Sequence, residues 1–508
     1  MSDLEEAPLT CNPPSPRRHL RVRWAARGVL GLYLALALLY SVVTPLFEGY
    51  DENWHYAFVH HLTSGQGLPR QPASEYPHLA HQEASQPPLY YALAAALIWW
   101  VPDNDLAAYL QANENPQFVP LPLPYRDNRN MMVHRPAEGF PFRGVALAVH
   151  LARLLSVALG AGVVWCTYAL ARVLFPAQET LALLAMALVA WTPGFIFTSA
   201  LVNNDILVAF LSALTLLWLA RLWSAEASTR RLVGLGLLLG AAALTKLSGL
   251  LLWALAGAVL GLRAWQGGRR QRLLRWAGLV YLPALLVCGW WFARNLALYG
   301  DLTGLGSMLD LMGRRAAGFG LGDAWAEAQG VRWSYWALFG QTNLPLPFWL
   351  YRLWDALLGV GLLGMAWHLL RLLRGRAWGA VARWVFLAAW AGAVAVALVR
   401  WTLLTTGSQG RLLYPAVGAL SLLLAQGWLA WTPMGGRWRA GMAAALAGAF
   451  LAAAAAAPFL VIAPAYAQPA VLHPQEAAAR AQQPAAVRFG EGVRLLGYTL
   501  QQVQVAPG

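Results

Sequence analysis

The sequence predicts an all-α polytopic membrane protein with about 11 transmembrane helices, juxtamembrane helices on the outer face and a short C-terminal β-hairpin. Of the 508 residues, 58% are hydrophobic and 12% are charged, whereas soluble domains carry about 25% charged residues. The 37 Lys and Arg residues exceed the 23 Asp and Glu residues, and they cluster in short loops between apolar segments. That arrangement is typical of charges that orient a membrane protein. It excludes an ordinary soluble enzyme and argues against nucleic acid as the partner of the positive charge.

The first predicted span, 26–46, follows a basic tail, 1–25. The arginines at its start favour a cytoplasmic N-terminus. A transmembrane domain is expected over 26–463, with large outer loops at 47–149 and 294–348. The ten later spans are expected near 150–174, 180–199, 203–222, 232–247, 248–264, 277–293, 349–370, 384–402, 412–431 and 440–463.

One apolar segment, 87–101, is too short to assign by length, because a helix needs about 20 residues to cross the hydrocarbon core. If it crossed, the arginine-rich loops between the later spans would move to the outer face. The positive-inside rule therefore favours a juxtamembrane or re-entrant helix on the outer side. This topology predicts a plasma-membrane protein with a cytoplasmic N-terminus, an outer C-terminus and an outer active site, because the long polar loops are then all outside.

The C-terminal tail divides into two parts. Residues 464–486 are rich in Pro, Ala and Gln and are typical of a linker. Residues 487–508 contain two short alternating segments, around Gly490 and Gly497, that predict a β-hairpin. Two strands cannot bury a core alone, so this segment is expected to be a truncated β-domain or to dock elsewhere.

An acidic pair, Asp51 and Glu52, comes just after the first span. Asp51 and His55 are four residues apart and therefore share a helix face. One interpretation is a general base held at the membrane surface to deprotonate an acceptor, with Asp51 as the base and Glu52 as its supporting neighbour. The alternative is a solvated helix start, where acidic residues favour the positive end of the helix dipole.

A second polar stretch, His78 to Gln86, precedes Pro87 and Pro88. It contains His81 and Glu83, and together with Asp51 or His55 these side chains have the chemistry to bind a metal ion. Their spacing matches no defined metal motif, so no metal ligands are assigned. No cofactor is expected with certainty, and a divalent metal is kept as a candidate.

Three cations, Lys246, Arg294 and Arg411, stand at outer span ends and so oppose the positive-inside trend. Cations at a membrane boundary usually have a partner. That partner is either a carboxylate or lipid headgroup, or the phosphate of a lipid-linked substrate, which arginine forks match well.

Two further segments have both structural and functional interpretations. Asn203, Asn204 and Asp205 precede a span, and we favour helix capping over cavity lining for them. The aromatic segment 333–343, which ends in Asn343, suits sugar rings but suits an interfacial helix equally well.

The order of these motifs resembles that of the GT-C glycosyltransferases, and more narrowly of bacterial protein O-mannosyltransferase-like and lipid A galacturonosyltransferase-like (Rgt-type) enzymes. The similarity covers roughly residues 25–460. Besides the acidic pair, it is carried by the segments QPPLYY, LARLLSVALGAGVVWCTYALARVLF, NNDILVAFLSALTLLWLA, LTKLSGLLL, WWFARNLALYGDLTG and QGRLLYPAVGAL.

The resemblance implies transfer of a sugar from a polyprenyl-phosphate carrier to a protein, lipid or cell-envelope glycan on the outer face. It implies that Asp51 or Glu52 is the catalytic base. It also implies a basic group on the donor phosphate, a role that Lys246, Arg294 or Arg411 would fill, and His55, Glu83 and Asn343 complete the set of candidate substrate-binding residues. A single displacement would invert the anomeric centre.

Two other classes of function remain open at this stage. A lipid or polysaccharide transporter or flippase would place charged residues within the spans and would contain paired repeats, whereas most charges here lie at span ends. A non-catalytic membrane scaffold is the second alternative. The identity of the sugar and of the acceptor, the metal dependence and the oligomeric state are not encoded in any motif of this sequence.

Overall fold

The computed structural model describes residues 16–72, 74–75, 78–114, 116, 129–224, 226–266, 270–433, 436–467, 474–489 and 493–498. Expectations for 1–15, for 468–473 of the linker, for the turn at 490–492 and for 499–508 lie outside these residues. The chain forms two compact units, 1–465 and 466–508, which are described separately.

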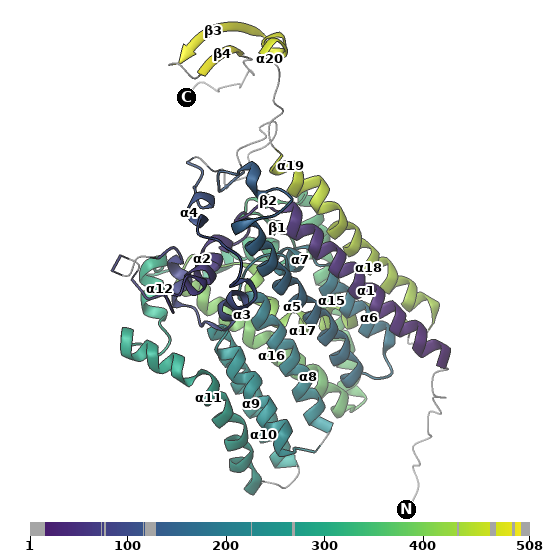
Figure 1. Ribbon diagram of the computed structural model, residues 1–508. Helices are drawn as coiled ribbons and strands as arrows, with labels where there is room; N and C mark the ends of the chain where they lie inside the picture. The colour runs from purple at the N-terminus through teal and green to yellow at the C-terminus, as the bar shows by residue number, and fades with distance from the viewer. Residues whose placement is uncertain are drawn as a thin grey trace, which may run out of the picture. The chain divides into compact units, whose positions relative to one another are not determined.

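The first unit is a bundle of long helices (Figure 1). Its main elements are α1 (Pro16–Val43), α5 (Gly144–Leu174), α6 (Glu179–Trp191), α7 (Pro193–Ser199), α8 (Asp205–Ser224), α9 (Thr229–Ala243), α10 (Leu251–Gln266), α11 (Leu273–Tyr299), α15 (Phe348–Arg374), α16 (Trp378–Leu404), α17 (Val417–Leu429) and α18 (Arg437–Ala457).

Within the described residues, nine helices are long and apolar enough to cross a membrane, or ten if the bent pair α6–α7 is one span. The predicted all-α membrane fold is thus confirmed. The expected segment that is not counted among these helices is 232–247, where α9 has only 15 residues, or about 22 Å at 1.5 Å per residue. Helix α9 nevertheless leads from the end of α8 back to Lys246, which pairs with Asp205 at the start of α8, so it runs between the two ends of the bundle.

The expected span 180–199 is broken by a bend of 60° between α6 and α7. Pro193 causes the break, because proline lacks the N–H that would continue the helix and is well suited to the first turn of a new one. The bend turns Phe195 and Phe197 of α7 into the core, where both are fully buried.

Helix α5 lies at the centre of the bundle and packs against α1, α6 and α8. Gly160 permits this close packing, since a Cβ atom at that position would lie 2.0 Å from the Tyr33 hydroxyl of α1. Small residues at helix crossings are the usual means by which membrane helices approach each other.

A layer of short elements covers one end of the bundle. Figure 1 shows α2 (Glu52–Thr63), α4 (Leu106–Tyr109) and α12 (Leu305–Met312) at this end. The layer also contains the 3-10 helix η1 (His81–Ser85), α3 (Leu89–Ile98), α14 (Ala328–Trp336) and the paired strands β1 (Leu338–Phe339) and β2 (Leu344–Pro345). Two further 3-10 helices, η3 (Leu247–Leu250) and η5 (Gly410–Ala416), precede α10 and α17.

Helix α3 does not cross the bundle. Its 10 residues span about 15 Å, half of the hydrocarbon thickness. The amide of Leu89 donates a 3.0 Å hydrogen bond to the carbonyl of Leu244, just after α9. After α3 the chain returns to the start of α5, where the Pro102 carbonyl lies beside Gly144. Segment 87–101 therefore begins and ends at one end of the bundle, as the sequence predicts.

The second unit contains α20 (Pro474–Arg480) and an antiparallel hairpin of β3 (Gln483–Phe489) and β4 (Val493–Tyr498). The β-hairpin is confirmed, but its first strand begins inside the segment expected to be a linker. The linker was expected from the Pro, Ala and Gln content of 464–486. Pro484 is accommodated near the start of β3, beside a break in the pairing register between Pro484 and Val487, which is where strands tolerate proline.

Candidate active site

Asp51 stands at the junction between the first span and α2, in a left-handed backbone conformation with φ 54°. Asp and Asn adopt this conformation more readily than other residues with a side chain. The loop before it is held tightly: the Gln341 amide donates to the Gly49 carbonyl at 2.6 Å. The side chain of Asp51 makes no helix-capping hydrogen bond. Instead it forms an ion pair with Arg411, so its carboxylate is not simply solvated.

Arg411 belongs to η5, whose position is fixed by α14. The amide of Gly410 donates to the Ser334 hydroxyl at 2.7 Å, and a Cβ atom at Gly410 would lie 2.2 Å from the Tyr335 nitrogen. The aromatic segment after residue 332 therefore serves to place Arg411. The guanidinium lies over the Tyr50 ring, 5.1 Å from its centroid, and its Nε donates to Gln409 Oε1 at 2.7 Å.

Asp205 connects Arg411 to Lys246. Its Oδ2 lies 3.1 Å from Arg411 Nη1, and its Oδ1 accepts a hydrogen bond from Lys246 Nζ. Capping of α8 is the role of Asn203, whose Oδ1 accepts from the amide of Ile206 at 3.1 Å. The capping interpretation of the Asn-Asn-Asp segment is therefore met by its first residue, while the third joins a charged cluster.

The result is a row of alternating charges, Asp51–Arg411–Asp205–Lys246, which we call the ion-pair row. Its members come from four separate segments of the chain: the start of α2, η5, the start of α8 and the turn after α9. The two ends of the row are the accessible parts: the side chains of Asp51 and Lys246 are 22% and 19% exposed, against 2% for Asp205. Between them, Arg411 keeps 9% of its side chain exposed, so a ligand that reaches the two ends also meets the edge of its guanidinium.

Glu52 points away from this row into the bundle. It forms a fully buried ion pair with Arg153 of α5, with Nη2–Oε2 at 2.6 Å and Nε–Oε1 at 2.7 Å. The same carboxylate accepts hydrogen bonds from the amides of Phe47 and Val202. Arg153 in turn donates to the carbonyls of Ser41, Thr44 and Pro45. Glu52 therefore ties the loop that carries Asp51 to the central helix.

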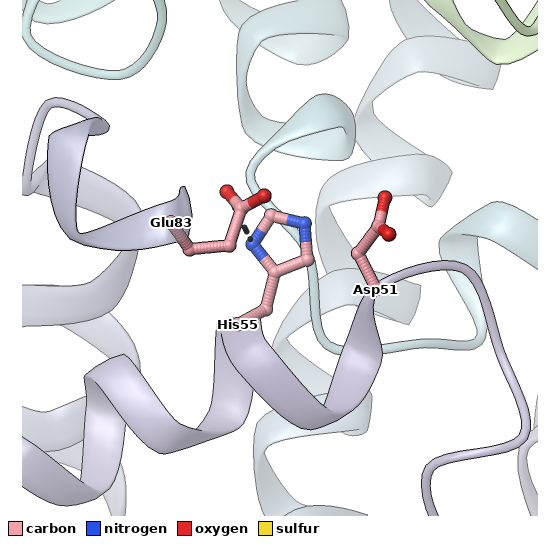
Figure 2. Close-up of side chains that lie close together, drawn as sticks. All are labelled: Asp51, His55 and Glu83. Atoms are coloured by element: carbon pink, nitrogen blue, oxygen red, sulfur yellow. Dashed lines mark ion pairs between the residues drawn. The ribbon is translucent and has the colours of Figure 1, made fainter. Parts of the chain in front are cut away.

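His55 and Glu83 lie beside Asp51, and Figure 2 shows the imidazole between the two carboxylates. His55 Nδ1 is 2.8 Å from the Tyr91 hydroxyl and 3.4 Å from Glu83 Oε2. The Tyr91 hydroxyl also donates to Glu83 Oε2 at 3.2 Å. Both His55 and Glu83 are buried, which places a titratable pair directly behind Asp51.

Burial shifts the protonation of this pair. It lowers the pKa of the His55 imidazole well below its usual value, and the charge of Arg411 lowers it further. Burial, with the negative charge of Asp51 as the second cause, raises the pKa of the Glu83 carboxyl above its usual range. The imidazole is therefore neutral at pH 7, and the raised pKa of Glu83 favours its uncharged carboxyl, so the contact between them is a polar contact and not an ion pair.

Two other predicted site residues make their contacts elsewhere. Arg294 of α11 donates to the Pro69 carbonyl at 2.9 Å and stacks over the Trp291 ring, 4.9 Å from its centroid. Asn343 donates to the Arg129 carbonyl at 3.0 Å and so fastens one loop of the covering layer to another. Neither forms a described contact with the ion-pair row, so their substrate-binding roles stay predictions.

Three residues of the site were missed or undervalued from the sequence. Arg153 reads as a charge near the start of a span, Asp205 as a helix cap, and Gln341 as one amide in an aromatic segment. The signal for Arg153 and Asp205 was present: an ionised group at membrane depth needs a partner of opposite charge. Gln341 carried no such signal.

The side chains of Asp51, His55 and Glu83 could hold a metal ion, because each offers one donor atom and these atoms all lie within 4.8 Å of one another. His81, the other candidate ligand, instead stacks on Trp54 with ring centroids 5.0 Å apart. The structure thus brings together two carboxylates and one histidine from the candidate metal ligands that the sequence predicts.

Comparison with known families gives one match. Residues 148–292 match the family described as dolichyl-phosphate-mannose-protein mannosyltransferase. The match covers less than half of the chain, from α5 to α11, and includes Arg153, Asp205 and Lys246. No curated protein matches the chain.

Solved structures of two enzymes are similar to this chain, and those of the first have a similar fold. The oligosaccharyltransferase of Archaeoglobus fulgidus in its apo form is similar with a TM-score of 0.50 and 15% identity, over 85% of this chain and 56% of that one. The same enzyme tethered to an acceptor peptide containing the NVT sequon gives 0.50 and 14%, over 89% and 56%. ArnT of Cupriavidus metallidurans bound to undecaprenyl phosphate gives 0.47 and 14%, over 86% and 73%.

The chain thus spans little more than half of the archaeal enzyme. The resemblance to the GT-C superfamily is confirmed at the level of the fold.

Proposed function

We propose that this chain is a membrane glycosyltransferase that moves a sugar from a polyprenyl-phosphate carrier to an acceptor on the outer face of the plasma membrane. The observation that carries the proposal is the ion-pair row, in which a partly exposed carboxylate and two cations meet at one end of the bundle. The fold and the family match over residues 148–292 support the same class of reaction.

The side chains supply what glycosyl transfer from a phosphate carrier needs. The acceptor oxygen attacks the anomeric carbon while the bond from that carbon to the phosphate oxygen breaks. Asp51 takes the proton of the acceptor hydroxyl, and the carrier phosphate leaves with the bonding electrons. Attack from the face opposite the leaving group inverts the anomeric centre. The reaction balances without an external oxidant or reductant.

The cations retain donor capacity for the phosphate. A guanidinium has five N–H donors and an ammonium has three. Arg411 directs one donor to each of Gln409, Asp51 and Asp205, and Lys246 directs one to Asp205. The remaining donors suit the oxygens of a phosphate, whose charge would be stabilised as it develops.

A donor-binding measurement tests the phosphate role. Replacing Lys246 by Gln is expected to weaken binding of a polyprenyl-phosphate sugar by about tenfold, because one charged hydrogen bond contributes roughly 1.5–3 kcal/mol. Binding is measured by titrating detergent-solubilised protein with the donor. The side chain is partly exposed, so folding should survive the change.

The matched control is Arg332→Gln, which removes another ion-paired cation, the partner of Asp355, from α14. It should leave donor affinity unchanged. Equal affinities of the Lys246→Gln protein and the wild type would refute the phosphate assignment. Arg294→Gln is expected to weaken donor binding less than Lys246→Gln does. The Arg294 guanidinium already donates to a backbone carbonyl and stacks on an aromatic ring.

The proposed sidedness follows from the arginines at the opposite end of the bundle, and cysteine labelling tests it. In a background without the native cysteines, a single cysteine at exposed Asn104 is expected to react with an impermeant thiol reagent from outside intact cells. A cysteine at exposed Ser228 is expected to react only when the cytoplasmic side is opened. Labelling of Ser228 in intact cells would reverse the topology.

A further inference from the structure

We propose that Asp51, His55 and Glu83 form a binding site for one divalent transition-metal ion, with Zn²⁺ as the best fit. We call these three residues the carboxylate–imidazole cluster (Figure 2). The proposal goes beyond glycosyl transfer, since the binding of an ion by these side chains requires neither a sugar donor nor an acceptor.

The distances between the three side chains are close to those of ligands around a bound ion. Zinc binds nitrogen and oxygen ligands at about 2.0–2.2 Å, so two tetrahedral ligands lie about 3.4 Å apart. His55 Nδ1 and Glu83 Oε2 are already 3.4 Å apart. All three donor atoms lie within 4.8 Å of one another, so small side-chain rotations would bring the third ligand into place.

The supporting contacts favour a fixed ligand set. The Tyr91 hydroxyl donates to Glu83 at 3.2 Å and lies 2.8 Å from His55 Nδ1. When the imidazole lone pair turns to a metal, this hydroxyl keeps its hydrogen bond to Glu83 and orients that ligand. Hydrogen bonds of this kind to metal ligands commonly determine affinity. His55 and Glu83 are also held by burial, which lowers the entropy that ordering the ligands would cost.

The local charge leaves room for a further cation once Glu83 gives up its proton to the ion. Among the described residues, the carboxylates of Asp51, Asp205 and Glu83 then face two cations, Arg411 and Lys246. Arg411 pairs with one oxygen of Asp51. An ionised carboxylate has about four lone-pair sites, so Asp51 can also bind an ion and retain a site for the acceptor proton.

The ligand types favour one class of ion. A histidine with two carboxylates suits Zn²⁺, Co²⁺ and Mn²⁺, whereas Mg²⁺ and Ca²⁺ prefer sites built from oxygen alone. Three protein ligands leave a fourth position open to water or a substrate oxygen. That position would lie beside Asp51 and the ion-pair row.

Metal titration of the full chain tests the proposal. Tag-free protein is purified in detergent, stripped with a chelator and titrated with Co²⁺, which is followed by its visible absorption, and with Zn²⁺ by calorimetry. We expect a single ion per chain, with Mg²⁺ unable to compete. His55→Gln and Glu83→Gln should each weaken binding by at least about 10–100-fold, the range found for weaker perturbations of ligand surroundings.

His60→Gln is the matched control, because His60 lies on the same helix and also contacts a carboxylate, with Nδ1 2.9 Å from Asp103, but is outside the cluster. It should keep wild-type metal affinity. Thermal unfolding of each variant identifies those that do not fold. Tyr91→Phe, which retains the ring, provides a further variant, in which a smaller loss of metal affinity is expected. Wild-type protein that binds no ion, or variants at His55 and Glu83 that both bind like the wild type, would overturn the site. Transfer activity plays no part in this readout, so failure of the metal site leaves the proposed reaction standing.

Discussion

Asp51→Asn is expected to reduce turnover of a lipid-linked sugar donor by about 10²–10⁴-fold, the usual contribution of a positioned general base. Asparagine retains the size of the side chain but cannot take the acceptor proton. The expectation rests on the position of Asp51 at the exposed end of the ion-pair row, with its carboxylate against Arg411 and with no capping role to lose. Donor binding and expression should stay close to those of the wild type.

Turnover is measured with saturating donor and a competent acceptor, so that the loss appears in kcat. Asp310→Asn is a suitable control, because Asp310 is an exposed carboxylate that pairs only with Arg314 one helical turn away. Near-normal turnover of the Asp51→Asn enzyme would exclude Asp51 as the base. Glu83, which lies next to it, would then be the next candidate.

Glu52→Gln is expected to destabilise the fold by about 3–5 kcal/mol, because it leaves the Arg153 charge buried without its counter-ion. Both side chains are fully buried, and the two contacts between them are 2.6 and 2.7 Å long. The amides of Phe47 and Val202 would also lose a charged acceptor. The effect is expected in thermal or denaturant unfolding of the purified protein, and any fall in turnover should follow the loss of folded protein.

An ion pair with a more exposed carboxylate provides the comparison. Glu327→Gln removes the partner of Arg315, where the carboxylate is 37% exposed, and should cost at most about 1 kcal/mol. Replacing Glu52 and Arg153 together by apolar residues should cost less than the sum of the single changes, since no unpaired charge remains. A stable Glu52→Gln protein that lacks turnover would instead assign Glu52 a direct part in the chemistry.

Several elements could be predicted because their signals are local. A membrane span is recognised by its length and its apolar composition. Ten of the eleven expected segments therefore coincide with helices that are long and apolar enough to cross a membrane, or with the bent pair α6–α7. The alternation of residues 487–498 was sufficient for a hairpin. One boundary was wrong for a local reason: the Pro, Ala and Gln content of 464–486 indicated a linker, and the first residues of β3 lie within it.

The site was predictable only as a set of candidates. The sequence determined that Asp51, Lys246 and Arg411 lie at span ends on one side of the membrane domain, because charges are costly within hydrocarbon. Only the tertiary structure decided which of them meet. Asp205 brings Lys246 and Arg411 together across a gap of more than 160 residues in the chain, whereas Arg294 turns to a backbone carbonyl and Asn343 to a neighbouring loop.

The division of roles between two adjacent carboxylates is the clearest example. Nothing in the local sequence distinguishes Asp51 from Glu52. The structure separates them because successive residues at a helix start point in different directions, one toward Arg411 and the other toward Arg153 on the central helix. Composition and spacing determined the fold class and the pool of charged residues, and long-range packing determined which charges became partners.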